Sequence, residues 1–262
     1  MPLLQHVTAK VVEGLVESIL KKNFDKPAPT PDCHREWWEL CCTPYKFVAI
    51  AAPRRHAKST AITHSYTIAN IVFRQSSFIL IVSDTETQAT FFLSDIKKEL
   101  VENEDLMKMF GIKGLIKDAI SDFIVEFDDG HQARVIAKGS GQSLRGVKWN
   151  GKRPDLIVGD DLENDEIVMN KDRREKFRRW LLGVLIPCRA KDGILRLIGT
   201  ILHQDSMLER LMPQEGRKDV IVTDLKISFH PNSKSEWKSV KYKAHDKKFT
   251  KALWPEFRPV EW

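Results

Sequence analysis

The chain has 262 residues, 42% of them hydrophobic, which is enough for one large α/β domain, the arrangement we expect, or for two small ones. Its 42 basic and 36 acidic residues give a formal net charge of +6, which permits contact with nucleic acid without requiring it. No apolar run approaches the roughly 18 residues of a membrane span, and the four cysteines lack C-x-x-C spacing, so we expect a reduced, cytosolic protein without membrane contact.

The chain begins with an amphipathic pattern that predicts a helix over residues 9–22, followed by a proline-rich link. We expect residues 1–31 to form an N-terminal arm, residues 32–230 the core, and residues 231–262 a C-terminal lid or linker. The start of the core, up to residue 42, predicts a helix that packs His34, Trp37 and Trp38.

A loop typical of phosphate binding follows. Residues 47–51 (FVAIA) predict a buried strand, residues 61–73 predict a helix, and APRRHAKST lies between them. The standard pattern G-x-x-x-x-G-K-[ST] has glycines where this chain has Ala52 and Ala57. A positive φ would cost alanine on the order of 1 kcal/mol, so we expect negative φ at both alanines.

The loop predicts a nucleotide site for ATP and Mg²⁺. Its backbone N–H groups and the following helix N-terminus would face the phosphates, Lys58 would bridge the β- and γ-phosphates, and the Ser59 hydroxyl would ligate Mg²⁺. The predicted nucleotide-binding residues are Pro53, Arg54, Arg55, His56, Ala57, Lys58, Ser59 and Thr60. The alternative is an ordinary helix N-terminus with an exposed lysine and a hydroxyl cap.

The rest of the pattern alternates strands with helices, which predicts an α/β fold with a mainly parallel central sheet flanked by helices. The predicted elements are strands at residues 78–82, 155–158, 194–198 and 220–223, and helices at residues 86–103 and 171–182. Within this series, residues 120–137 alternate with a period of two around Asp128-Asp129-Gly130, which predicts an inserted β-hairpin.

Three carboxylates end the strand DLIVGDDLE, in the form of a Walker B strand. We expect Asp160 to hold Mg²⁺ through its water shell and Asp161 to orient or deprotonate the attacking water. Glu163 is the alternative catalytic carboxylate because its longer side chain could reach the same water. Acidic residues can also merely mark the exit of a strand into a turn.

Two further segments suit catalysis on a phosphate. The glycine-rich residues 138–146 present Arg145, which suits an arginine finger, and Arg54 and Arg55 are rivals for that role. Arg145 could equally pair with a surface carboxylate or with DNA phosphate. After the strand at residues 194–198, Thr200 could sense the γ-phosphate, although a strand-end Gly-Thr is usually a turn.

Basic runs offer candidates for DNA binding. Residues 171–179 hold six basic residues, among which Lys171, Arg174 and Arg178 are the predicted contacts, and residues 238–251 hold six lysines. The alternative for both runs is a solvated charged face with internal ion pairs.

Five segments in order resemble the ATPase domain of the large terminase subunit of tailed bacteriophages, over about residues 31–262. They are APRRHAKST, SLRGVKWNGKRPDLIVGDD, Arg179-Trp180, LRLIGTILHQDSM and Leu253-Trp254-Pro255. The resemblance implies an additional-strand P-loop ATPase that drives double-stranded DNA into an empty capsid, with Thr200 as the coupling residue. It implies that Arg54 and Arg145 match the two positions of a catalytic arginine.

The resemblance also implies partners and limits. The partners are double-stranded DNA, further copies in a homo-oligomeric ring on the viral portal, and the small terminase subunit, in the host cell cytoplasm. Such proteins usually continue into a nuclease domain; we expect none here and no nuclease activity. The alternatives are a P-loop ATPase of helicase or remodelling type and a degenerate P-loop protein that binds nucleic acid without turnover.

Overall fold

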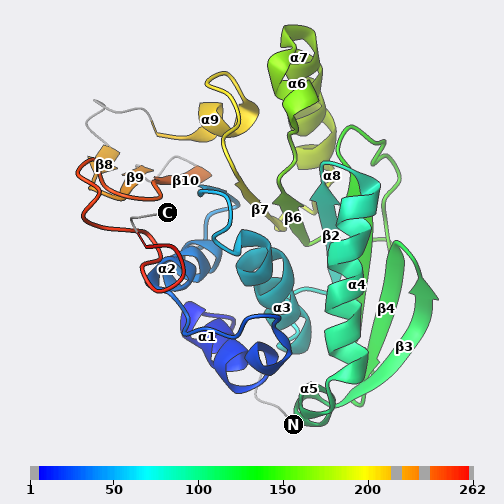
Figure 1. Ribbon diagram of the computed structural model, residues 1–262. Coiled ribbons are helices and arrows are strands. Elements are labelled where there is room, and N and C mark those ends of the chain that lie inside the picture. The colour runs from blue at the N-terminus through cyan, green and yellow to red at the C-terminus, as the bar shows by residue number, and fades with distance from the viewer. Residues whose placement is uncertain (1–5, 214–219, 230–236, 260–262) are drawn as a thin grey trace.

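The protein forms one broad sheet with helices on both faces, seen in a computed structural model that describes residues 6–213, 220–229 and 237–259 (Figure 1). Within these residues the sheet has ten strands in the order β3-β4-β5-β2-β6-β7-β1-β10-β9-β8. The strands are β1 (Phe47–Ala51), β2 (Phe78–Ser83), β3 (Ile112–Ala119), β4 (Asp122–Phe127), β5 (Gln132–Gly139), β6 (Leu156–Asp160), β7 (Ile194–Gly199), β8 (Val220–Val222), β9 (Lys226–Phe229) and β10 (Trp237–Tyr242).

The centre of the sheet is parallel. β5, β2, β6, β7, β1 and β10 pair in parallel, while β3 and β4 at one end and β9 and β8 at the other pair antiparallel. The central strands β1, β2 and β6 are buried along their whole length, which explains their unbroken apolar sequences. The predicted α/β fold and the β4–β5 hairpin are confirmed.

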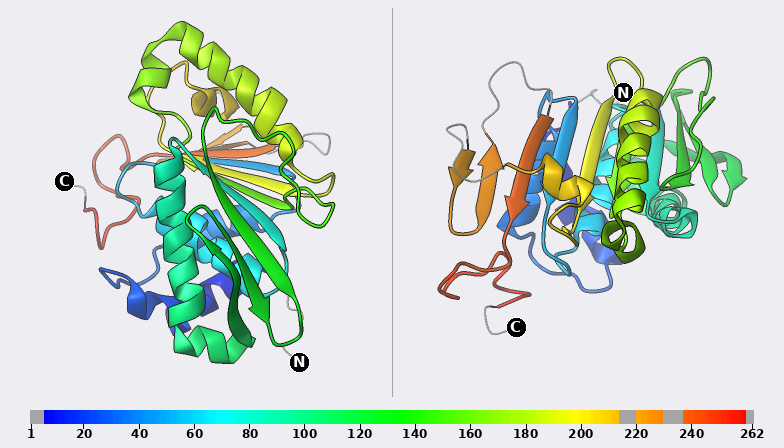
Figure 2. Two further views of the ribbon diagram at one scale, coloured as in Figure 1. Left: turned by 90° about the vertical axis from the view of Figure 1, so that its right-hand side faces the viewer. Right: turned by 90° about the horizontal axis from the view of Figure 1, so that it is seen from above.

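Helices cover the two faces of the sheet and form two separate cores (Figures 1 and 2). The helices are α1 (Ala9–Ser18), η1 (Leu20–Asn23), α2 (Asp32–Cys41), η2 (Thr60–Tyr66), α3 (Thr67–Val72), α4 (Glu86–Glu102), α5 (Glu104–Phe110), α6 (Asp165–Met169), α7 (Lys171–Trp180), η3 (Leu181–Leu185), α8 (Ile186–Cys188) and α9 (Met207–Leu211). Helices α1 to α5 pack on one face, and the helix formed by α7, η3 and α8 packs on the other. The amino-terminal part of that second helix, together with α6, rises beyond the sheet (Figure 1).

The predicted N-terminal arm packs on the body of the protein. Thr8 caps α1 by accepting a hydrogen bond from the Val11 amide, and Val12 and Leu20 are fully buried in the core that also contains α2 and α4. The helix predicted over residues 9–22 is confirmed as α1 and η1. The boundary at residue 31 stays a prediction.

The sheet extends into the segment predicted as a C-terminal lid or linker. β10 lies there and pairs with β1, with Phe47 opposite Trp237 and Ala51 opposite Lys241. Residues 237–242 are therefore part of the sheet, which corrects that part of the expectation. Residues 231–236 and 260–262 of the segment lie outside the described residues. β3, β9, α5, α6 and α9 were also not predicted.

Arg196 on β7 lies buried between the sheet and the end of α2. Its side chain is 2% exposed, and its guanidinium donates to the carbonyl oxygens of Cys41 at 2.8 Å, Thr43 at 3.2 Å and Tyr45 at 3.0 Å. Among the described residues, backbone carbonyls are the main hydrogen-bond partners of this buried charge, and the Tyr66 side chain also interacts with it. The contacts join the α2–β1 connection to β7.

Among the described helices, none is both long enough and apolar enough to span a bilayer.

Candidate nucleotide site

Three adjacent parallel strands bring the predicted site residues to one edge of the sheet. Ala51 at the end of β1 is opposite Gly199 at the end of β7, and Asp160 at the end of β6 is opposite Ile198. Because parallel strands end at the same edge, the phosphate-type loop, the two aspartates and Thr200 follow neighbouring strands. The predicted strand–loop–helix context is confirmed, with helical backbone starting at Lys58.

Lys58 lies at the centre of this edge. Its Nζ donates to Thr200 Oγ1 at 2.9 Å and to the Pro53 carbonyl at 3.2 Å, and the residue is 7% exposed. Burial lowers the pKa of Lys58, while Asp161 and Asp160 act in the opposite direction. The ammonium group therefore lies within electrostatic reach of both carboxylates.

Two residues of the loop have a left-handed backbone conformation. Arg55 has φ 64° and Ala57 has φ 51°, so the expectation of negative φ at Ala57 was wrong; Ala52 is not among the positive-φ residues. The chain must reverse between Arg54 and the first helical residue, and Ala57 provides the last step of that reversal at a cost of about 1 kcal/mol.

Two histidines hold the loop in this conformation. The ring of His34 on α2 meets the His56 carbonyl at 2.8 Å, and the ring of His56 meets the Arg54 carbonyl at 2.9 Å. Burial lowers the pKa of His34 to about 4, so it is neutral near pH 7, and its Nε2 must carry the proton that the carbonyl accepts. Trp38 on α2 also donates to the Ala61 carbonyl at 2.8 Å. These contacts offset the cost of the two turns.

Asp160 is the most buried charged group of the site. It is 0% exposed, and its Oδ2 accepts from Thr63 Oγ1 at 2.6 Å. Burial raises the pKa of Asp160 to about 6, against the lowering effect of Thr63 and Ser59. Its Oδ1 has no hydrogen-bond partner among the described residues. Sequence reasoning missed Thr63, which sits one helical turn beyond Ser59 and so faces the same carboxylate.

This donor set fits Mg²⁺. A buried, unpartnered carboxylate oxygen beside a serine hydroxyl offers the oxygen ligands that Mg²⁺ prefers, and nucleotide sites supply the other ligands from phosphates and water. In the described part of the chain, no group of three or more His, Cys, Asp or Glu is placed to hold a metal.

Asp161 and Glu163 have different environments. Asp161 is exposed with φ 44°, and its Oδ1 accepts from the Thr200 amide at 2.8 Å. Both oxygens of Glu163 are occupied at the start of α9, accepting from the Met207 amide at 2.9 Å and the Leu208 amide at 3.0 Å. Of the two candidates for the catalytic carboxylate, the structure brings Asp161 to Lys58, whereas the cations that act on Glu163 are Arg178 and Arg174.

The candidate arginines are separated. Arg54 and Arg55 are exposed on the loop, and Arg54 is near enough to lower the pKa of Lys58. Arg145 is exposed, makes no hydrogen bond or ion pair with any described residue, and lies beside Gly183 and Val184 of η3. Among the described residues, the charges that act on Lys58 are Asp161, Asp160 and Arg54, and Arg145 is not one of them.

The predicted DNA contacts on α7 are largely engaged within the chain. Arg174 Nε donates to Asp205 Oδ2 at 3.0 Å, and Arg178 lies 2.9 Å from Asp205 Oδ1. Arg210 also reaches Asp205, at 2.6 Å, and hydrogen bonds from Arg210 and Arg178 hold the pKa of this carboxyl well below its usual range. Of the three candidates, Lys171 alone is exposed without a partner among the described residues.

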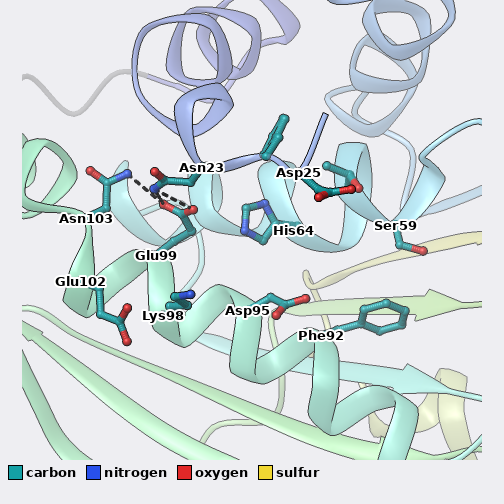
Figure 3. A pocket seen from close by; sticks show the side chains of 12 residues that line it. Asn23, Asp25, Ser59, His64, Phe92, Asp95, Lys98, Glu99, Glu102 and Asn103 are labelled. Atoms are coloured by element: carbon teal, nitrogen blue, oxygen red, sulfur yellow. Dashed lines mark hydrogen bonds between the residues drawn. The ribbon is translucent and has the colours of Figure 1, made fainter. Parts of the chain in front are cut away.

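Two hollows flank the loop. The aromatic hollow, about 270 Å³, is lined by Trp38, Thr60, Trp254 and Phe257, so the C-terminal segment contributes two aromatic rings that sequence reasoning did not assign to a site. The other hollow, about 570 Å³, lies between η2 and α4, where Asn23 and Asn103 donate to Glu99 (Figure 3).

Comparison with known proteins identifies the fold. No family model and no curated protein matches the sequence. Among solved structures, a mutant of the large terminase ATPase domain of Thermus phage P74-26 is similar with a TM-score of 0.54 and 16% identity, over 82% of this chain and 80% of that chain. A second structure of that ATPase domain gives a TM-score of 0.53 and 17% identity, over 78% of each chain. The α/β fold with a mainly parallel central sheet flanked by helices is thus shared with these domains.

Proposed function

We propose that the chain is the ATP-hydrolysing motor domain of a viral DNA-packaging terminase. The observation that carries the proposal is the position of Lys58, which joins the loop to Thr200 and lies within electrostatic reach of Asp160 and Asp161. The similarity of the fold to large terminase ATPase domains supports it.

Each residue of the site has a role in this proposal. The backbone N–H groups of residues 53–60 and Lys58 bind the ATP phosphates, and the aromatic hollow accepts the base. Ser59 and Asp160 hold Mg²⁺, which, when bound, neutralises charge on the phosphates. Asp161 orients the attacking water. When the phosphates bind the Lys58 ammonium group, the Thr200 hydroxyl loses its hydrogen bond from Lys58 and can contact the γ-phosphate.

The catalytic arginine is either Arg54 of the same chain or Arg145 of a neighbouring one. Arg54 lies on the loop and acts on Lys58, whereas Arg145 is exposed without such a contribution and is available to a second copy. We further propose that copies form a ring on the viral portal in the host cell cytoplasm, with double-stranded DNA and the small terminase subunit as partners.

The test is ATP hydrolysis by the purified chain and by Lys58→Ala. We expect the substitution to lower the rate at least about a hundredfold, because it removes the charge that faces the developing negative charge on phosphate. The assay is release of inorganic phosphate, with Lys191→Ala, an exposed lysine far along the chain, as the matched control.

Equal rates in the unaltered chain and Lys58→Ala would contradict the enzymatic proposal. If neither hydrolyses ATP but both bind duplex DNA, the alternative of a degenerate P-loop protein without turnover replaces it.

A further inference from the structure

A small basic hollow lies between the loop that joins β5 to β6 and the helix formed by η3 and α8. That helix packs on the face of the sheet opposite α4 (Figure 2). This basic recess measures about 170 Å³ and is lined by Arg145, Gly146, Lys148 and Arg153 of the loop and by Gly183 and Pro187 of the helix. The loop is fixed there: Trp180 Nε1 donates to the Gln142 carbonyl at 2.8 Å, and Arg153 donates to the Pro187 carbonyl.

Positive charge in the recess is not balanced by nearby carboxylates. Its lining contains three cations and no acidic residue. Both segments that form it also lack acidic residues in sequence, over residues 130–154 and 176–191. Arg145 and Lys148 are exposed and have no hydrogen-bond or ion-pair partner through their side chains among the described residues. The arginines around Asp205 are different, because a carboxylate there already satisfies them.

The shape of the recess suits a phosphate group. Gly146 has φ 77°, and space is open around both Gly146 and Gly183, so the backbone of a ligand can approach closely. Arginine and lysine commonly bind phosphate oxygens. The planar guanidinium of arginine can donate two parallel hydrogen bonds, and the ammonium of lysine acts as a compact positive charge. No aromatic ring lines the recess on which an unpaired base could stack, and no Asn or Gln is present to read a base edge.

We propose that the basic recess binds a backbone phosphate of double-stranded DNA through Lys148 and Arg153, without reading its sequence, which leaves Arg145 to the nucleotide of a neighbouring copy. This inference rests on the proposed function, for which it supplies the DNA-facing surface. It replaces Arg174 and Arg178 as principal contacts. The helix that carries Gly183 and Pro187 continues into α7, and Asp205 ties α7 to the segment that follows Thr200. The recess is thus linked through α7 and Asp205 to the segment that follows Thr200.

The experiment measures binding of a short fluorescent duplex to the full chain by anisotropy, without nucleotide, over a series of salt concentrations. Loss of one phosphate contact reduces the magnitude of the negative slope of log affinity against log salt concentration by about 0.9. At about 0.1 M salt this corresponds to a roughly eightfold loss of affinity for the duplex. We expect this change in Lys148→Gln, to the same extent for duplexes of unrelated sequence. Lys10→Gln, which removes the same charge from an exposed site on α1, on the other face of the sheet, should change neither quantity.

Three results would overturn the inference: no loss in Lys148→Gln, equal losses in Lys148→Gln and Lys10→Gln, or preferential binding of single strands. A further arm replaces chloride by inorganic phosphate at constant ionic strength. Displacement of the duplex by phosphate alone would assign the recess to a small anion instead. Because DNA binding is measured without nucleotide, its result is independent of ATP hydrolysis. Loss of the DNA-binding inference would therefore leave the ATPase proposal standing, and loss of the ATPase proposal would leave the DNA-binding result standing.

Discussion

At the scale of single residues, the phosphate-type loop depends on alanine in a backbone conformation that favours glycine. Ala57 has φ 51° immediately before Lys58, and the hydrogen bonds of His34 and His56 hold the loop around it. The orientation of the Lys58 amide and side chain follows from that turn. The alanine therefore stores strain next to the residue on which the proposed function depends most.

Replacing this alanine by glycine tests the strain. We expect Ala57→Gly to raise the free energy of unfolding by about 0.5–1 kcal/mol, since relief of the left-handed cost exceeds the added entropy of glycine in the unfolded chain. The measurement is urea denaturation followed by tryptophan fluorescence. Ala61→Gly, a few residues later in the following helix, is the control and should lower the same free energy by about 1 kcal/mol. A destabilised Ala57→Gly would show that the turn carries no such cost.

The positions of Lys58, Asp160 and Thr200 at one edge could be predicted from sequence, because each follows a buried strand and parallel strands end together. Their catalytic roles stay predictions. The ion pairs of Arg174 and Arg178 with Asp205 could not be predicted, because Asp205 lies far along the chain and no local pattern encodes the contact. The positive φ of Ala57 was not predicted, because the sequence argument considered the conformational cost to alanine alone. The hydrogen bonds of His34 and His56 that offset this cost come from the tertiary structure.

At the scale of elements, one carboxylate connects the projecting helix α7 to the segment after β7. Asp205 accepts from Arg174 and Arg178 on α7 and from Arg210 on α9, while Glu163 fixes the start of α9. Three guanidinium groups around one carboxylate would repel one another if its charge were removed.

Neutralising that carboxylate should release α7. We expect Asp205→Asn to speed hydrogen exchange of the α7 amides about tenfold or more, with little change in β6 and β7, because the helix loses its tie to the following segment. Exchange followed by mass spectrometry measures this. Glu175→Gln on the exposed side of the same helix is the control. Unchanged exchange in Asp205→Asn would mean that packing of Phe177 and Trp180 alone fixes α7.

Sequence patterns predicted most elements of the sheet and missed β3, β9 and β10. β3 contains two register irregularities and Gly114 at φ 143°, which break the alternation that marks a strand. β10 (WKSVKY) is rich in lysine, and its stability comes from parallel pairing with β1, almost two hundred residues earlier. Such a pairing is invisible to any local window.

At the scale of the whole molecule, the first helices belong to the same core as the strands of the site. Leu20 of η1 is 0% exposed and lies in the core that contains α2, α4 and residues of β1 and β6. Residues 9–23 therefore contribute to the stability of the body and are more than an appendage.

Truncation of that leucine measures the contribution. We expect Leu20→Ala to lower the global free energy of unfolding by about 2–5 kcal/mol, the usual range for a buried leucine. Guanidinium denaturation gives the value, and Leu182→Ala, at a leucine that is 56% exposed, should change it by less than about 0.5 kcal/mol. A small effect at Leu20 would instead support an N-terminal arm that unfolds independently.

The buried guanidinium of Arg196 limits which parts of the site can move. It fixes the chain that enters β1 to β7, and the same two strands end at the loop and at Thr200, with Ala51 opposite Gly199. Sliding of β1 along β7 would break several hydrogen bonds of the buried Arg196 guanidinium, which water cannot reach. The two strands therefore keep fixed positions relative to each other. Any change in the Lys58–Thr200 contact during the proposed catalytic cycle would then have to arise beyond the strand ends.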